Sequence, residues 1–272
     1  FTPEETAQRR VVEAKLLSVF QRWGFREIIA PTFEYLEVFE QPTGEDATDQ
    51  IFKFVDRQTG RLLALRVDIT SQVARLVATT LRQAPLPLRL AYAATVFRYR
   101  EPQAGRHREF EQIGVELIGL NLPEADAEMI AMAVEGCQVV GLPAFQIDVG
   151  QVEVVRGLLN ALQPSAELRP RLISAIRRKD SLELDMLLQE VSADPGLLEA
   201  IRALPQLYGG REILDEAARL ALPPVSRAAL ANLAEVVTIL ENYGLADRVI
   251  LDLAETHDFE YYTGAVFGAF AR

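Results

Sequence analysis

Arginines gather in one short stretch of a chain that is acidic overall. Arg98, Arg100, Arg106 and Arg108 stand beside His107 in a protein whose formal net charge is -11. Each guanidinium presents a flat fork of donors that grips a phosphate or a carboxylate with two hydrogen bonds. We therefore predict that an anion binds here, with Arg100, Arg106 and Arg108 as the phosphate candidates. A solvated, positively charged turn explains the composition equally well.

Two predicted strands hold this arginine stretch between them. Residues 88–97 lead into it, and residues 110–119 alternate between apolar and polar types on the way out, so the arginines occupy the tip of a hairpin. In the second strand Gln112 and Glu116 point to the same face as Gly114. A glycine between two polar residues leaves room for a ligand. A polar face on a half-exposed strand is the commoner explanation of such a pattern.

A second pair of polar residues precedes a predicted helix. Residues 50–55 and 61–68 predict a hairpin with a glycine in its turn, and a helix follows from Ile69 to about Arg82. Asp68 and Thr70 stand where that helix begins. Asp and Thr are preferred at helix starts because their side-chain oxygens accept from free backbone amides. Capping is therefore the simplest interpretation of this pair.

Composition limits the classes of protein that fit. The chain has 272 residues, 49% hydrophobic and 25% charged, which is typical of a soluble globular protein of one large or two modest domains. It contains no apolar run of about 20 residues and no signal-peptide pattern, so we expect a cytoplasmic protein. A single Cys137 excludes an internal disulfide, and with only two histidines no metal site is predicted. The sequence pI near 4.9 disfavours a general nucleic-acid surface.

The rest of the chain mixes helices with short strands. A capping box from Thr2 to Glu5 opens a helix that ends near Gly24, with Val11, Val19 and Phe20 on its core face. Residues 151–243 are almost wholly helical in pattern, and they contain no catalytic constellation. Further predicted elements are a strand at 25–31, a helix from Pro123, and strands at 145–150, 248–253 and 259–271. The fold class is therefore α+β.

One motif in the arginine stretch is long and specific. Residues 97–112 read Phe-Arg-Tyr-Arg-Glu-Pro-Gln-Ala-Gly-Arg-His-Arg-Glu-Phe-Glu-Gln, which resembles motif 2 of the class II aminoacyl-tRNA synthetases in its histidyl-tRNA synthetase version. Residues 62–75 and 256–267 also resemble histidyl-specific segments, and the likeness covers essentially the whole chain. It implies a class II antiparallel sheet flanked by helices in one domain over residues 1–272, with residues 151–243 as a mainly helical segment inside it.

The resemblance implies a pocket for histidine or a similar effector. Asp68 and Thr70 match the carboxylate and hydroxyl that bind the amino group of histidine in those synthetases. Gln112 and Glu116 match the residues that contact the bound amino acid, and Arg98 matches the arginine that holds its carboxylate. The implied effector-binding residues are Asp68, Thr70, Arg98, Gln112, Glu116, Tyr261 and Tyr262.

The sequence differs from the synthetase pattern in three places, and in synthetases these places serve ATP and tRNA functions. Arg100 stands where synthetases have a glutamate, and His257 stands where they have a catalytic arginine. Loss of preorganised positive charge of that kind costs about 10² in rate. The sequence also ends at Arg272 without a motif 3 or an anticodon-binding domain. It therefore resembles the histidyl-synthetase paralogues that serve as regulatory subunits of ATP phosphoribosyltransferase.

That family implies a non-catalytic role in histidine biosynthesis. We expect no aminoacylation, no cofactor, assembly with a separate ATP phosphoribosyltransferase catalytic subunit, L-histidine as effector, and neither a membrane nor tRNA as partner. Residues 2–31 resemble motif 1, which implies a homodimer. A histidyl-tRNA synthetase catalytic core lacking its anticodon-binding domain is the alternative, and a stand-alone amino-acid-binding paralogue is a third interpretation.

Overall fold

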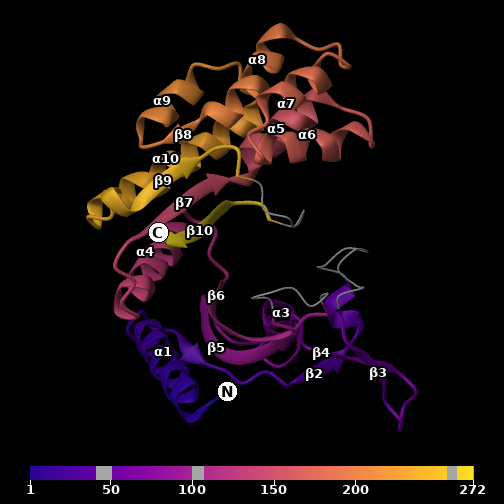
Figure 1. The fold of residues 1–272 in the computed structure, drawn as a ribbon, viewed down its shortest axis with the longest axis vertical. Helices are drawn as coiled ribbons and strands as arrows, with labels where there is room; N and C mark the ends of the chain where they lie inside the picture. The colour runs from indigo at the N-terminus through magenta and orange to yellow at the C-terminus, as the bar shows by residue number, and fades with distance from the viewer. Residues whose placement is uncertain (41–50, 100–106, 256–261, 272) are drawn as a thin grey trace. The chain divides into compact units, whose positions relative to one another are not determined.

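The computed structural model describes residues 1–40, 51–99, 107–255 and 262–271. The chain divides into two compact units, residues 1–121 and 122–272, each with its own helices and strands (Figure 1). Most strand pairs in both units are antiparallel, and helices accompany them, which confirms the predicted α+β class. Within the described ranges, every helix is too short or not apolar enough to cross a membrane. A single domain over the whole chain stays a prediction.

The first unit is built on two sheets, in the strand orders β1-β5-β6 and β2-β4-β3. Its elements are α1 (Pro3–Arg22), β1 (Arg26–Glu27), β2 (Phe33–Tyr35), β3 (Lys53–Val55), β4 (Leu62–Leu65), α3 (Thr70–Thr79), β5 (Leu88–Phe97) and β6 (Glu109–Ile118). The predicted capping box is confirmed, because the Thr2 hydroxyl accepts from the Glu5 amide at 3.3 Å while the Glu5 carboxylate accepts from the Thr2 amide at 2.8 Å.

The hairpin of β5 and β6 is the longest strand pair in this unit, and it confirms the two strands predicted around the arginine stretch. Apolar side chains of β5 and α3 form its core, namely Ile69, Val73, Leu90, Tyr92 and Val96. Two expectations for the N-terminal region are wrong. Val11 is exposed rather than part of the core. The strand expected at residues 25–31 is only two residues long, β1, because beyond Glu27 the chain keeps a single further bond to β5, from the Ile28 amide to the Ala91 carbonyl.

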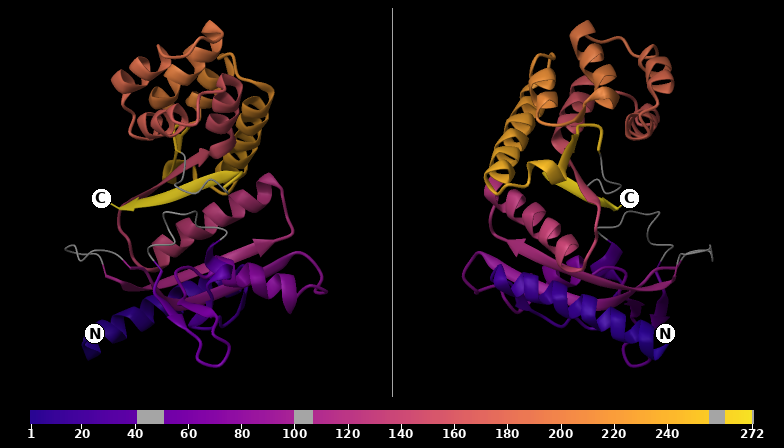
Figure 2. Two further views of the ribbon diagram at one scale, coloured as in Figure 1. Left: turned by 90° about the vertical axis from the view of Figure 1, so that its right-hand side faces the viewer. Right: turned by 60° about the vertical axis from the view of Figure 1, so that its left-hand side comes forward.

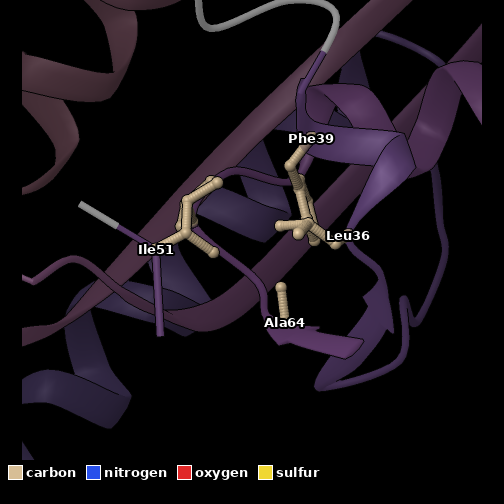
Figure 3. Close-up of a cluster of buried hydrophobic side chains, with 5 residues drawn as sticks. Leu36, Phe39, Ile51 and Ala64 are labelled. Atoms are coloured by element: carbon tan, nitrogen blue, oxygen red, sulfur yellow. The ribbon is translucent and has the colours of Figure 1, made fainter. Parts of the chain in front are cut away.

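A second, smaller core supports the sheet of β2, β4 and β3. Leu36, Phe39, Ile51, Ala64 and Val67 form it, and Figure 3 shows the first four of these side chains close together. The hairpin predicted between residues 50 and 68 is confirmed as β3 and β4, with its turn at Asp56 to Gly60. Phe33 and Phe54 meet edge to face at 5.9 Å between ring centroids on this sheet, and both remain exposed.

The second unit contains one sheet, in the order β10-β7-β9-β8. Its elements are α4 (Pro123–Val139), β7 (Phe145–Gln151), α5 (Val152–Leu162), α6 (Leu168–Arg177), α7 (Ser181–Leu188), α8 (Pro195–Ala203), η1 (Leu204–Gln206), β8 (Tyr208–Gly209), α9 (Glu212–Ala218), α10 (Pro224–Asn242), η2 (Ala246–Arg248), β9 (Val249–Asp252) and β10 (Ala265–Ala271). Figure 2 shows the helices of residues 152–218 gathered at one end of this unit. The short strand β8, which pairs with β9, interrupts the helical pattern that the sequence predicted.

Helices α5 and α10 approach closely at a glycine. Ser226, in the first turn of α10, is fully buried, and its hydroxyl donates to the Val154 carbonyl of α5 at 2.8 Å. A Cβ atom placed on Gly157 would lie 2.9 Å from the backbone nitrogen of Ser226. The contact therefore requires a residue without a side chain at position 157.

Gly157→Ala should destabilise the protein, although alanine is the better helix former by about 1 kcal/mol. The added methyl group has to displace Ser226, and overpacking of this kind costs about 1–3 kcal/mol. Chemical denaturation measures the free energy of unfolding. Ala161→Gly is the matched control, because this exposed position on the same helix changes helix propensity alone and should cost about 1 kcal/mol. A Gly157→Ala protein that is more stable than the wild type would contradict the close approach.

Candidate functional site

Two predicted pairs of polar residues meet in the first unit. Asp68 and Thr70 flank the start of α3, while Gln112 and Glu116 lie in β6. The Gln112 amide nitrogen donates to the Asp68 carboxylate at 2.9 Å, and the Thr70 hydroxyl donates to the Glu116 carboxylate at 2.7 Å. All four side chains are partly exposed. Together with Tyr92 they make up what we call the polar cluster.

Capping of α3 by Asp68 or Thr70 is the wrong interpretation. The N-cap residue is Ile69, and the helix start has no side-chain capping bond of its own. The Ile69 amide donates instead to the side-chain oxygen of Gln112, at 3.3 Å. Gln112 of β6 thus accepts from the amide of the N-cap residue, a bond that the third helical residue makes in a capping box. This bond also orients the Gln112 side chain that donates to Asp68.

Tyr92 is a member of the cluster that sequence reasoning missed. It stands opposite Gly114 in the β5–β6 register and is only 4% exposed. Its hydroxyl lies 3.4 Å from both the Glu116 carboxylate and the Gln112 amide nitrogen. A Cβ atom on Gly114 would come within 2.7 Å of that hydroxyl. The space expected to hold a ligand is therefore occupied by the tyrosine ring, and only the strand register reveals the pairing.

The polar cluster contains two carboxylates, Asp68 and Glu116. Burial raises the pKa of Glu116; the hydrogen bond from Thr70 lowers it, and the charge of Asp68 raises it again. Burial is also the main cause that raises the pKa of Tyr92, with Glu116 adding to the effect. Among the described residues, the hydrogen bonds to the two carboxylates come from a hydroxyl, a phenol and an amide, all neutral. A cationic group of a ligand would complement this arrangement.

Arg98 lies next to the polar cluster along the backbone. Its Nε donates to the carbonyl of Val67, the residue before Asp68, at 3.1 Å. The guanidinium also lies over the Phe110 ring, 5.1 Å from its centroid. The structure thus brings Arg98 together with the four predicted residues of this unit, and it places a positive charge close to their edge.

The buried Arg66 positions the segment that carries Asp68. Its Nη1 donates to the Ala30 carbonyl at 2.8 Å, and its Nε donates to the Thr95 carbonyl. Burial lowers the pKa of this guanidinium. Buried charge is tolerated only when it is hydrogen-bonded, and these carbonyls supply the bonds. Arg66 therefore ties the approach to α3 to both β5 and the segment after β1.

Of the other predicted residues, the structure describes Arg108 and Tyr262. Arg108 is exposed, with its guanidinium 4.6 Å from the centroid of the Tyr99 ring. Tyr262 lies in the second unit, where its carbonyl accepts from Arg156. Arg100, Arg106, Tyr261 and His257 lie outside the described residues. No group of three or more potential metal ligands occurs in the part of the chain that the structure describes.

Comparisons with known proteins place the sequence in a family. A family model described as histidyl-tRNA synthetase matches residues 1–272. The ATP phosphoribosyltransferase regulatory subunit of Syntrophotalea carbinolica is 47% identical and aligns with 99% of this chain, which spans 63% of that relative. The protein of the same name from Moorella thermoacetica is 43% identical over 97% of this chain and 68% of its own length.

A solved structure agrees with these relatives. It is described as an ATP phosphoribosyltransferase regulatory subunit/histidyl-tRNA synthetase from Bacillus halodurans, superposes with a TM-score of 0.90 at 32% identity, and covers 99% of this chain and 70% of its own. The predicted class II synthetase-like fold is thereby confirmed. The chain belongs to the histidyl-tRNA synthetase family and, within it, to the ATP phosphoribosyltransferase regulatory subunits.

Proposed function

We propose that this chain is the synthetase-like part of a regulatory subunit that controls a separate ATP phosphoribosyltransferase catalytic subunit. It carries no aminoacylation activity, and it serves the first step of L-histidine biosynthesis by making that step sensitive to histidine. Its relatives bear the corresponding name, although the chain spans only 63% of the first of them. The observation that carries the proposal is the polar cluster, in which two half-buried carboxylates are held by neutral donors.

Histidine fits the charges of the polar cluster. Its ammonium group is a cation that Asp68, Glu116 and the Thr70 hydroxyl can bind. Its carboxylate matches the guanidinium of Arg98, since arginine binds carboxylates through paired hydrogen bonds. Gln112 contacts the same ligand. By resemblance Tyr261 and Tyr262 also contact it.

Regulation then follows from a difference in affinity. A ligand shifts an equilibrium only as far as it binds the two states unequally. The Gln112–Asp68 and Thr70–Glu116 bonds exist without a ligand, so histidine has to replace them with bonds of its own. The inhibited state of the assembly is the one in which histidine replaces these bonds more easily and so binds more tightly.

The case for the proposed phosphate-binding residues is weaker than the case for the proposed histidine-binding residues. Arg108 is exposed and stacks on Tyr99, and we assign it, with Arg100 and Arg106, to anion binding. No cofactor is proposed. The name of the matching family model favours an alternative, the catalytic core of a histidyl-tRNA synthetase. Histidine-dependent exchange of pyrophosphate into ATP by the full-length protein would establish that alternative. A stand-alone paralogue would be purified from its source without a catalytic partner.

A second copy of the chain is the other proposed partner. Ile29, just after β1, is 94% exposed. Three apolar residues of the β2-β4-β3 sheet are also exposed, namely Phe33, Phe54 and Val55. Helix α3 holds this segment in place, because Gln72 donates to the Pro31 carbonyl at 2.9 Å and Arg75 pairs with Glu34 at 2.6 Å. Apolar surface of this kind is typical of subunit interfaces. We propose that it is buried in a homodimer. The cytoplasmic location expected from the sequence stays a prediction.

ATP phosphoribosyltransferase activity of a short catalytic subunit from the same source tests the proposal directly. Activity should appear only when the full-length regulatory protein is added, and histidine should suppress it. Asp68→Ala and Gln112→Ala should each raise the half-inhibitory histidine concentration about tenfold or more, because a lost hydrogen bond to a charged group costs about 1.5–3 kcal/mol. Glu111→Ala, on the opposite face of β6, should leave inhibition unchanged. Full histidine sensitivity in both pocket variants would refute the assigned pocket.

The Glu116→Gln variant should be more stable than the wild type and should bind histidine more weakly. Burial raises the pKa of Glu116 above its ordinary 4.5, so the folded protein holds the proton more tightly than the unfolded chain. Below that ordinary value the carboxyl costs nothing, whereas its ionisation destabilises the fold as the pH rises through the raised pKa. The stability advantage of the glutamine variant should therefore grow from pH 4 towards pH 8. Thermal unfolding measures this advantage, with exposed Glu111→Gln as control, and calorimetry should detect weaker histidine binding.

Ile29→Asp should weaken the homodimer, since a charge placed in an apolar interface loses its hydration. Light scattering on a sizing column should show a smaller mass at low micromolar concentration. Leu182→Asp is the control, because Leu182 is 81% exposed on α7 of the other unit. An unchanged mass for Ile29→Asp would exclude Ile29 from the interface.

A further inference from the structure

The first turn of α5 holds the chain that leads into β10. The Val152 amide, at the start of α5, donates to the Gly264 carbonyl at 3.2 Å. One turn further along, an Nη2 hydrogen of Arg156 is donated to the Tyr262 carbonyl. Residues four apart lie on the same face of a helix, so both bonds come from one side of α5. Two carbonyls in the run from Tyr262 to Gly264 are thus fixed by one helix end.

The guanidinium of Arg156 is itself oriented. The Glu153 carboxylate lies 2.5 Å from its Nη1, and each of the two side chains is 24% exposed. The Glu153 amide donates to the side-chain oxygen of Gln151 at 3.4 Å, and Gln151 donates to Asn232 of α10 at 2.9 Å. The arginine therefore projects from a helix start that is anchored to α10.

This anchoring acts on a residue that the proposed pocket needs. Tyr262 precedes β10 by three residues, and β10 is in register with β7 from Ala265 onward, opposite Gln151. Between the strand and the tyrosine, the backbone is held by Val152 and Arg156. These two bonds fix the backbone on the β10 side of Tyr262.

We infer that Arg156 is a positioning residue for effector binding, which acts by fixing the backbone of Tyr262. The inference rests on the proposed function, in which Tyr262 contacts histidine. A bond between a guanidinium and a carbonyl is charge-assisted and directional. Without it, the ligand has to order the segment on binding, and ordering of one side chain costs about 0.5–1.5 kcal/mol, equivalent to about 2- to 13-fold in affinity.

A double-mutant cycle tests this inference. Histidine is titrated by calorimetry into the full-length protein in complex with its catalytic subunit, for the wild type, Arg156→Gln, Tyr262→Ala and the double variant. Arg156→Gln should raise the Kd about tenfold in the wild-type background and less than about twofold in the Tyr262→Ala background, because the arginine acts through the tyrosine. Arg169→Gln is the matched control. It removes a guanidinium that donates to Asn160 of α5, the helix of Arg156, at 2.9 Å. This change should leave the Kd for histidine unaltered.

Arg156→Lys keeps the experiment decisive if the glutamine variant fails to fold. Lysine retains one charged donor without the planar fork, so it should recover part of the lost affinity. An equal loss in both backgrounds, no loss in the wild-type background, or an unchanged Kd for Tyr262→Ala would overturn the role of Arg156. A wild-type complex that binds no histidine would instead refute the proposed function, so the two failures are distinguishable.

Discussion

The register of the β5–β6 hairpin is the constraint on which the candidate site depends. It sets Tyr92 against Gly114, and the absence of a side chain at Gly114 leaves room for the phenol end of the ring. The same register turns Gln112 and Glu116 towards the start of α3. A shift by one residue would send both to the opposite face, and Asp68 and Thr70 would lose their partners. The strand register therefore sets the geometry of the polar cluster, and Gly114 makes room for Tyr92 within it.

Electrostatics support the proposed role of this cluster in ligand binding. Burial and the nearby charge of Asp68 raise the pKa of Glu116, and the hydrogen bonds from Thr70 and Tyr92 offset this only in part. The framework of the same unit uses a different arrangement. Arg75 pairs with Glu34, so these two charges are matched within the protein. We propose that a cationic group of a ligand neutralises the carboxylates of the polar cluster.

Much of the fold follows from the sequence, because its signals are local. The capping box at Thr2, the hairpin turns and the two long strands each depend on residues that are neighbours in the chain. The membership of Asp68, Thr70, Gln112 and Glu116 in one cluster came from a resemblance, and local rules alone gave the wrong answer for Asp68 and Thr70. Tyr92 was missed because its partner, Gly114, is 22 positions away in sequence and becomes its neighbour only through register. Arg156 was missed for a similar reason, since its partner is the carbonyl of Tyr262, and carbonyls carry no sequence signal.

The start of α3 has a consequence for how a bound molecule would be felt elsewhere. The amide of Ile69, the residue just before this helix, donates to the Gln112 side chain of β6. A ligand that takes the Gln112 oxygen would compete with the Ile69 amide for this acceptor. Three residues after Ile69, Gln72 donates to the Pro31 carbonyl, and Arg75 of the same helix pairs with Glu34. Binding at the polar cluster and order in the exposed segment after β1 are thus connected through α3, because residues at its start and along its length contact both.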